Sequence, residues 1–471
     1  MAKVTYKQLD MTQGNILSSI IAFSIPLLVG SLFQTLYNTV DSAIIGNFVN
    51  TEALAAVGAC YSPMLILLAV VLGLASGVSV MVSQTFGSGN MDKVKNVIAT
   101  ANGFFLVSVI PVTLCALALI DPLLSIINVQ EGARQYANLY LLIIFGGLIG
   151  TYGYNLNSGI LRGLGDSRSP LLFLLVAFFV NVVLDLLFVL VMQWSVFGVA
   201  VATVMAQTVS WVYSIWHIKR HFPHLNYRLF SFHLDRALLG RIISLGLPLA
   251  MNHAIFSLGF LFYYRFVYGL GPTFMAGYSI AGKLEGFTWL PISSLGIAAV
   301  TFAGQNCGAG NLGLLNKGVK LFLKTAIGIN VLTAVITLLF ARTLLGLFTP
   351  DAEVIDAGFT YLTYLLPFYW IYSIIHILNG IMNGVGDVKT PTYISLLMFW
   401  GIRVPLAWYL STYFSGSVLH AAYPVSWVVG CALTVMYFMT GRWKRGITTK
   451  ENAGDEKTEP CECDFKPDKA A

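Results

Sequence analysis

The ten residues LRGLGDSRSP (161–170) return later in the chain as MNGVGDVKTP (382–391), a shift of 221 residues (391 − 170). A second pair has the same shift: VSQTFGSGNMDKV (82–94) corresponds to AGQNCGAGNLGLL (303–315). Self-similarity at a fixed spacing is the sequence signature of a repeated architecture. The chain therefore consists of two halves of common design, and the fold of one half predicts that of the other.

The composition is that of a membrane protein. Of the 471 residues, 57% are hydrophobic and only 10% are charged, whereas a soluble domain carries about 25% charged residues. Apolar runs near the ~20 residues of a membrane-spanning helix recur from end to end. A soluble fold would expose far more apolar surface than water tolerates, so we exclude that class.

The apolar runs predict an all-α protein with twelve transmembrane helices. They cover roughly 16–46, 54–84, 95–120, 135–160, 170–193, 196–218, 241–267, 274–304, 318–342, 355–381, 391–412 and 417–440. Pro26 and Pro248 occupy matching places in the first helix of each half, and we expect them to bend or break these helices. Because six spans per repeat keep both halves in the same orientation, we expect two six-helix lobes related by a pseudo-two-fold axis along the membrane normal.

The positions of Lys and Arg predict the orientation. Most of them, including Arg162, fall in loops on one side of the expected helices, and Arg134 and Arg342 fall on the other. Because Lys and Arg concentrate in cytoplasmic loops, both termini are expected in the cytoplasm. The expected segments are a cytoplasmic N-terminal segment (1–15), an N-lobe (16–218), a basic linker (219–240), a C-lobe (241–440) and a disordered cytoplasmic tail (441–471).

Asp41 is an acid inside an apolar helix. A carboxylate at mid-membrane costs about 2.5–3.5 kcal/mol on insertion scales, so its presence indicates a function. Helical spacing places Gln34, Tyr37 and Asn38 on the same face as Asp41, at i, i+3, i+4 and i+7. This stripe could line a substrate cavity inside the N-lobe. The alternative is a structural carboxylate that is hydrogen-bonded to its neighbours.

A second acid lies in FFVNVVLDLLFVL (178–190), where Asn181 and Asp185 share a helix face. Two close carboxylates hold one proton between them, because two ionised groups would repel each other. Binding of H⁺ or Na⁺ would relieve that repulsion. The alternative places Asp185 near the outer interface, since Gln193 and Trp194 follow two turns later.

The C-lobe lacks these acids, because Asp41 corresponds to Tyr263 or Phe262 and Asp185 corresponds to Leu406. Its intramembrane charges form a candidate network instead: Arg265, Lys283, Glu285 and Arg403. Glu285 either pairs with one of these cations or contacts a cationic substrate or a second ion. We expect Arg403 to stabilise the lobe by facing Glu285 or a carbonyl.

Several functions are excluded or disfavoured. The segment GYSIAGKL (277–284) ends in Leu284 where a nucleotide-binding loop needs Ser or Thr for Mg²⁺, so no ATP site is expected. No H-E-x-x-H or G-x-S-x-G cluster of an enzyme occurs. Cys461 and Cys463 lack a second pair at zinc-site spacing, so no metal site is expected. We expect no cofactor and no nucleic-acid partner.

Four segments together resemble the multidrug and toxic compound extrusion (MATE) family, of the bacterial type. They are FSIPLLVGSLFQTLYNTVDSAIIG (23–46), the Gln-x-x-Gly-x-Gly-Asn segment (84–90), LRGLGDSRSP and IRVPLAWYL (402–410). The resemblance covers nearly the whole chain and implies a V-shaped pair of helical bundles. It also implies that Asp41, Asn181, Asp185 and Thr203 lie where this family has its N-lobe polar residues. Taken without the resemblance, Thr203 is more simply a residue that bonds its own backbone.

The resemblance implies export of small organic, often cationic, compounds in exchange for inward H⁺ or Na⁺. We expect a monomer in the bacterial plasma membrane, in contact with lipid. The alternative is a lipid-linked oligosaccharide flippase with the same two lobes. A flippase needs a large cavity rich in Arg and Lys for a pyrophosphate, whereas the expected intramembrane cations are three and lie in one lobe.

Overall fold

The computed structural model describes residues 8–49, 51–127, 129, 131–230, 234–414 and 416–444. Helices dominate these residues, and no strand occurs among them. The N-lobe helices are α1 (Ile16–Phe48), α2 (Thr51–Gly87), α3 (Met91–Ala118), α4 (Ile120–Ile126), α5 (Glu131–Gly146), α6 (Leu148–Gly163), α7 (Arg168–Asp185), the π-helix η1 (Leu186–Val191) and α8 (Ser195–His221).

The C-lobe repeats this order. Its helices are α9 (Arg236–Tyr268), α10 (Pro272–Gly308), α11 (Leu312–Gly346), α12 (Ala352–Leu365), α13 (Tyr369–Val385), α14 (Lys389–Leu396), the π-helix η4 (Leu397–Arg403), α15 (Val404–Tyr413) and α16 (Ala422–Met439). Short 3₁₀ turns are η2 (Pro223–Leu225), η3 (Leu366–Phe368), η5 (Gly416–Ala421) and η6 (Arg442–Lys444).

The predicted twelve spans are confirmed. Eleven helices of the described chain are long and apolar enough to cross a membrane, and the bent pair α5–α6 makes the twelfth. The 50° bend of that pair falls at Gly146 and Gly147, which the sequence analysis did not anticipate. Pro26 and Pro248 break neither α1 nor α9, since both helices continue through them. Membrane helices tolerate proline because neighbouring groups satisfy the freed carbonyl.

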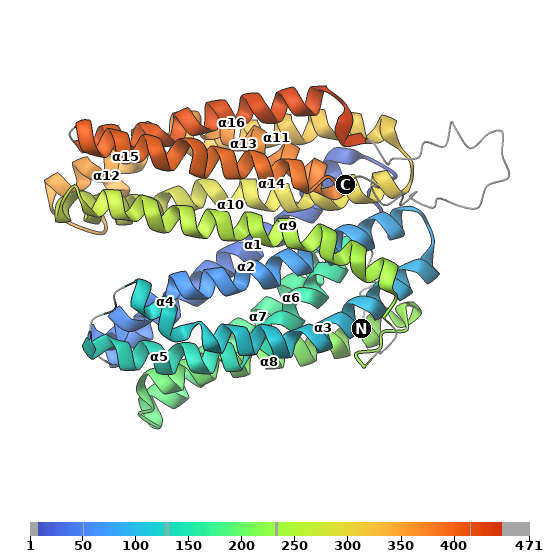
Figure 1. The fold of residues 1–471 in the computed structure, drawn as a ribbon, viewed down its shortest axis with the longest axis horizontal. Coiled ribbons are helices and arrows are strands. Elements are labelled where there is room, and N and C mark those ends of the chain that lie inside the picture. The colour runs from blue at the N-terminus through green and yellow to red at the C-terminus, as the bar shows by residue number, and fades with distance from the viewer. Residues whose placement is uncertain are drawn as a thin grey trace, which may run out of the picture.

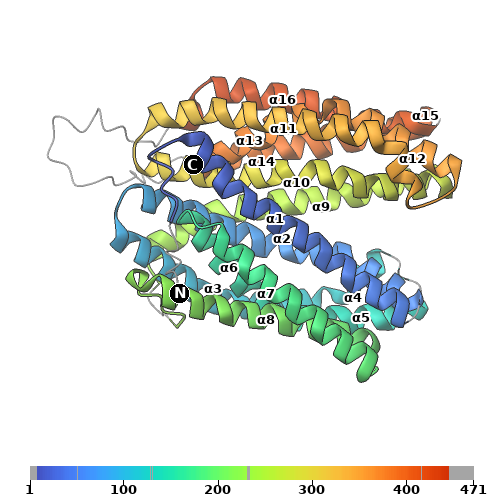
Figure 2. The same ribbon diagram turned by 180° about the vertical axis from the view of Figure 1, so that it is seen from behind.

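The two lobes lie against each other at the end where α1 begins and α16 ends, and they diverge toward the opposite end (Figures 1 and 2). At the closed end, each lobe donates a hydrogen bond to a backbone carbonyl of the other lobe. The Gln84 side-chain amide donates to the Gly384 carbonyl at 2.9 Å, and Gln305 donates to the Gly163 carbonyl at 3.2 Å. These pairs are equivalent at a shift of 221 (305 − 84 and 384 − 163). The pseudo-two-fold relation therefore holds at the level of single hydrogen bonds.

Two glycines allow this close approach of the lobes. A Cβ atom at Gly87 would collide with the Gln305 backbone, and one at Gly308 would collide with the Gln84 backbone. Only glycine fits where two helix backbones touch. We call Gln84, Gly163, Gln305 and Gly384 the clasp.

The segment before α1 is docked on the clasp. The Met11 backbone amide donates to the Gln305 side-chain oxygen at 2.9 Å, and Asn306 donates to the Met11 carbonyl at 3.1 Å. The Leu9 amide donates to the Gly165 carbonyl at 3.2 Å. The described part of the N-terminal segment is thus bound to both lobes.

The repeated Gly-Asp motif has a structural role in the N-lobe. The Asp166 carboxylate accepts from the backbone amides of Arg168 and Ser169 and so caps α7. The Ser169 hydroxyl also donates to this carboxylate, and it lies 3.0 Å from Nε2 of the buried His217.

The equivalent C-lobe motif repeats the hydroxyl contact. Asp387 accepts from the Thr390 hydroxyl at 3.1 Å and from the Tyr437 hydroxyl at 2.7 Å. The motif that reveals the repeat therefore anchors the first turn of the fifth span of each lobe to the sixth.

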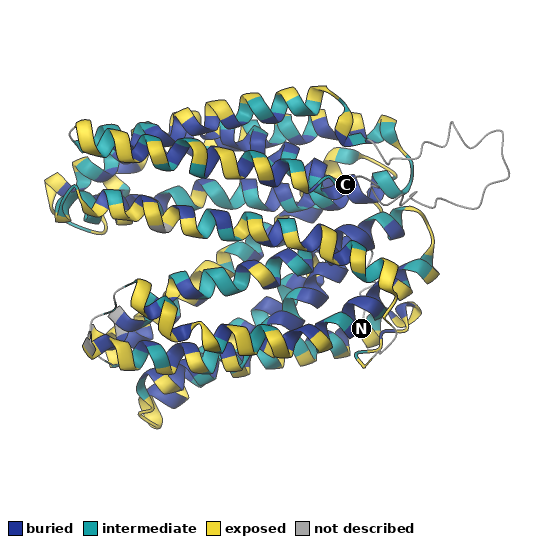
Figure 3. Cartoon of the chain, in the orientation of Figure 1, coloured by how far each residue is buried: buried dark blue, intermediate teal, exposed yellow. Residues whose placement is uncertain are grey.

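Exposed residues run along the outer faces of both lobes (Figure 3). Large apolar side chains that are well exposed include Ile110, Val183 and Leu339. Lipid is the solvent that accepts such a surface.

The segments that flank the lobes are partly packed. In the linker, Tyr227 is buried and donates to Asn157 at 2.8 Å. At the start of the tail, Trp443 is buried and donates to the Phe438 carbonyl at 2.9 Å. Residues 445–471, with Cys461 and Cys463, lie outside the described residues.

Candidate functional site

Asp41 and Asp185 lie together inside the N-lobe. Asp41 on α1 is 8% exposed, and Asp185 at the end of α7 is fully buried. The two carboxyl groups are close enough to interact directly. Two ionised carboxylates would both be acceptors and would repel, whereas a single shared proton supplies the missing donor. The pair is therefore suited to hold one proton or one cation.

The surrounding polar atoms have no partners of their own. Tyr37, Asn181 and Thr203 lie around the two acids. Side-chain atoms in this region without a hydrogen-bond partner are Tyr37 Oη, Asp41 Oδ1, Asn181 Oδ1 and Nδ2, both Asp185 carboxylate oxygens and Thr203 Oγ1. Buried polar atoms are rarely left unpaired. Hard cations prefer oxygen ligands of these kinds, so the donor set fits a proton or a small cation.

Tyr140 also belongs to this site, although its position in the sequence did not single it out. This buried tyrosine on α5 lies within electrostatic range of both Asp41 and Asp185. The repeat offered a signal, because Tyr140 corresponds to Tyr361 of the C-lobe at a shift of 221 (361 − 140), and Tyr361 contacts Glu285. An aromatic hydroxyl beside an acid is thus a shared feature of the two lobes.

Asp185 adjoins an irregular segment of backbone. The π-helix η1 begins at Leu186, directly after the acid. Single π turns inside α-helices occur frequently at functional sites. In the C-lobe the π-helix η4 ends on Arg403, so a buried charged side chain borders each π segment.

The predicted stripe on α1 is divided. Tyr37 and Asp41 are buried, whereas Gln34 and Asn38 are exposed. Gln34 and Asn38 therefore do not line a cavity inside the N-lobe. Side chains at positions i and i+4 cover a wider face of α1 than the strip that packs against α7. Gln34, Tyr37, Asn38 and Glu285 were the residues expected to line a substrate cavity. Only Glu285 is among the described residues that line the cavity between the two lobes.

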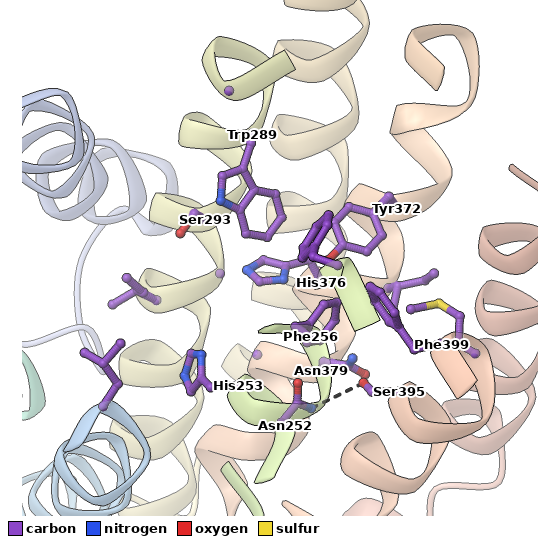
Figure 4. Close-up of a pocket in the computed structure, with 18 of the residues that line it drawn as sticks. Asn252, His253, Phe256, Trp289, Ser293, Tyr372, His376, Asn379, Ser395 and Phe399 are labelled. Carbon is purple, nitrogen blue, oxygen red and sulfur yellow. Dashed lines mark hydrogen bonds between the residues drawn. The ribbon is translucent and has the colours of Figure 1, made fainter. Parts of the chain in front are cut away.

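A cavity of about 880 Å³ lies between the lobes, mostly against the C-lobe (Figure 4). This volume suits a drug-sized ligand. Its polar lining includes Asn252, His253, His376 and Ser395, and Asn252 donates to Ser395 at 3.3 Å. Apolar and aromatic lining residues include Phe256, Tyr264, Trp289, Tyr372, Phe399 and Trp427.

The floor of the cavity adjoins the clasp. Ser79, Arg162, Val300 and Asn383 line the cavity. Arg162 and Asn383 directly precede Gly163 and Gly384 of the clasp in the chain. Arg162, expected in a cytoplasmic loop, lies in the last turn of α6 and lines this cavity.

Glu285 is held by two tyrosines. The hydroxyl of Tyr361 donates to one carboxylate oxygen at 2.5 Å, and the hydroxyl of Tyr369 donates to the other at 2.8 Å. No ion pair of Glu285 occurs among the described residues. Two roles were open for Glu285: an ion pair with a cation of the lobe, or contact with a cationic substrate or a second ion. The ion pair does not occur among the described residues of this structure.

Arg403 packs among aromatic rings. Its guanidinium carbon lies 4.0 Å from the ring centre of Phe399 and 4.4 Å from that of Tyr423. Its Nε donates to Ser426 at 3.0 Å. Arg403 thus packs through cation–π contacts and a hydroxyl. Glu285 lies within its electrostatic range, and no ion pair between the two occurs among the described residues.

The other two cations of the expected network lie apart. Arg265 is exposed in the last turn of α9 and is not among the described lining residues. Lys283 lines the cavity, and its ammonium group lies 5.3 Å from the ring centre of Phe348.

The sequence model of the MatE family matches residues 26–187 and 248–409, one segment in each lobe. The "Probable multidrug resistance protein YpnP" of Bacillus subtilis is 27% identical, over 93% of this chain and 98% of the relative. The "FAD transporter" of Shewanella oneidensis is 24% identical, over 83% of this chain and 87% of the relative.

A solved structure has the same fold. It is described as an outward-facing conformation of a multidrug resistance MATE family transporter of the MOP superfamily. The TM-score is 0.85 at 22% identity, and the match covers 93% of this chain and all of the solved chain.

Proposed function

The chain belongs to the MatE family, and we propose that it is a secondary antiporter that exports small organic compounds in exchange for H⁺ or Na⁺. The observation that carries this proposal is the buried Asp41–Asp185 pair with its unpartnered polar surroundings. A site that holds a proton or cation in one conformation and releases it in the other couples a gradient to transport.

Helix α1 offers a route from this ion site to the cavity. Its first half contributes Ile20, Phe23 and Leu27 to a cluster with Leu295 and Phe302 of α10. Its second half carries Asp41 toward α7. Helix α10 also carries Glu285 and Trp289 into the cavity. Protonation at Asp41 would therefore act on the cavity through the packing of α1 against α10.

Direct competition between ion and substrate is the simpler scheme, but the cavity lining does not favour it. Asp41 and Asp185 are absent from the described residues that line the cavity. We therefore propose that a change between two conformations of α1 couples ion binding to release of the compound. In the outward-open state H⁺ or Na⁺ enters at the acids, the compound leaves, and the lobes then rock inward and release the ion.

The orientation follows the proposed topology. With both termini in the cytoplasm of a bacterium, the clasp lies at the cytoplasmic end and the cavity opens outward. The protein acts as a monomer in this scheme, because each chain holds its own ion site and its own cavity.

The test is efflux of a fluorescent dye from proteoliposomes under an imposed H⁺ or Na⁺ gradient. We expect one gradient to drive efflux by the wild type and Asp41→Asn to lose the response to it. The matched control is Asp121→Asn, since Asp121 is exposed and its contact with Arg134 is long, at 3.9 Å. Full gradient-driven efflux by Asp41→Asn would assign that acid a structural role.

A lipid-linked oligosaccharide flippase is the second candidate. The observation in its favour is Arg162, which brings a cation of the N-lobe into the cavity beside Lys283 and Arg403. Binding of a pyrophosphate-linked lipid to the purified protein, without binding of any water-soluble dye, would favour the flippase.

A further inference from the structure

The cavity contains more cationic than anionic groups. Arg162, Lys283 and Arg403 line it, and Glu285 is the acid among its described lining residues. The ion pairs of the described chain are Lys95–Asp92, Arg134–Asp121 and Arg342–Asp356. None of these pairs neutralises a cation of the cavity.

Arg403 is a buried cation of the cavity with an unpaired N–H group. It is only 2% exposed, and its Nη2 has no hydrogen-bond partner although the residue lines the cavity. Glu285 lies within electrostatic range of Arg403, but no ion pair between them occurs among the described residues, and the hydroxyls of Tyr361 and Tyr369 donate to the two oxygens of Glu285. A buried charge without a directly bonded counter-charge is costly, so a ligand that brings an anionic oxygen to the guanidinium group would gain strongly.

Aromatic rings connect the open cavity to Arg403. The ring centres of Trp289 and Tyr372 are 5.6 Å apart, and those of Tyr372 and Trp427 are 5.3 Å apart. The Trp427 ring centre lies 5.8 Å from the Arg403 guanidinium carbon. Figure 4 shows Trp289 and Tyr372 on neighbouring helices with His376 beside both. A flat ring can therefore rest on this wall while its substituent reaches Arg403.

We propose that this cavity binds aromatic compounds that carry an acidic group, with a carboxylate, sulfonate or phosphate oxygen on Arg403 and the ring system against Trp289 and Tyr372. This proposal rests on the proposed transport function and specifies its substrate class. It differs from the family expectation of cationic compounds, because the described lining residues include three cations, Arg162, Lys283 and Arg403, and one acid, Glu285.

The test compares two dyes that differ only in the acidic group, rhodamine B and its ethyl ester. Binding to the full-length protein in detergent is measured by fluorescence polarisation. We expect the free acid to bind about tenfold more tightly than the ester, the size of one charge-assisted hydrogen bond. Equal affinity, or tighter binding of the ester, would overturn the proposal.

Two substitutions then locate the acid-binding group. Arg403→Gln should weaken binding of the free acid by about tenfold and leave the ester unchanged. Arg403→Lys should retain part of the preference, because the charge remains while the second N–H donor is lost. Arg265→Gln is the matched control, since this arginine of the same lobe is exposed and lies outside the described lining.

The outcomes separate this proposal from the antiport mechanism. If Arg403→Gln does not fold, the wild-type comparison of acid and ester still decides between the two ligand classes, and Arg403→Lys tests the location. A preference for the free acid that survives in both Arg403 variants would exclude Arg403 as the acid-binding group. Binding is measured without a gradient, so a failure of ion-driven efflux would refute antiport and leave the binding result standing.

Discussion

Removal of the two clasp glutamines should open the end of the molecule that is closed in this structure. Gln84 and Gln305 each donate to a backbone carbonyl of the opposite lobe, at 2.9 and 3.2 Å. These bonds exist only while the lobes touch at this end. We predict that Gln84→Ala combined with Gln305→Ala shifts the population toward the state in which this end is open.

The magnitude follows from the hydrogen bonds lost. Each contributes about 0.5–1.5 kcal/mol net, so the pair contributes roughly 1–3 kcal/mol to the observed state. That difference changes the ratio of the two states by about 5- to 150-fold. The single variants should differ, because Gln305 also accepts from the Met11 backbone amide at 2.9 Å. Gln305→Ala should therefore have the larger effect.

The assay is a distance measurement between spin labels on the two lobes by double electron–electron resonance. Labels at Ile126 and Leu347 suit it, since both side chains are more than 70% exposed and lie at ends of α4 and α11 away from the clasp. We expect a shorter distance to gain population in the double variant, because the lobes approach here as the clasp end opens.

The control is Gln135→Ala, which removes an exposed glutamine of α5. Its distance distribution should match that of the wild type. An unchanged distribution in the double clasp variant would refute the reasoning, because the clasp would then contribute nothing to the balance between states.

Two further predictions concern packing. Gly308→Val should prevent closure of the clasp, because any Cβ there collides with the Gln84 backbone; the same spin labels should report the shorter distance, and a wild-type distribution would contradict this. Trp443→Ala should lower stability by about 3–5 kcal/mol, the range for truncating a buried aromatic residue, since Trp443 stacks on Phe438 with ring centres 4.5 Å apart. Thermal unfolding in detergent measures this loss, and an unchanged midpoint would show that the start of the tail contributes nothing to the fold.

The sequence by itself determined the architecture of this protein. Hydropathy is a property of consecutive residues, so the run lengths predicted twelve spans that the structure confirms. The shift of 221 residues between LRGLGDSRSP and MNGVGDVKTP predicted two lobes of one design. An acid in an apolar helix is conspicuous in any sequence, and this was sufficient to single out Asp41 and Asp185.

Only the tertiary structure decided which side chains meet. Helical spacing groups residues on one face, but the rotation and tilt of each helix are set by packing against the others. This is why Gln34 and Asn38 are exposed beside a buried Asp41. For the same reason Arg162 lines the cavity although it lies at a helix end, and Arg403 packs against aromatic rings and makes no direct ion pair with Glu285 among the described residues. The residues that contact a charged side chain in the membrane lie on other helices. Their distance from it along the chain does not predict the contact.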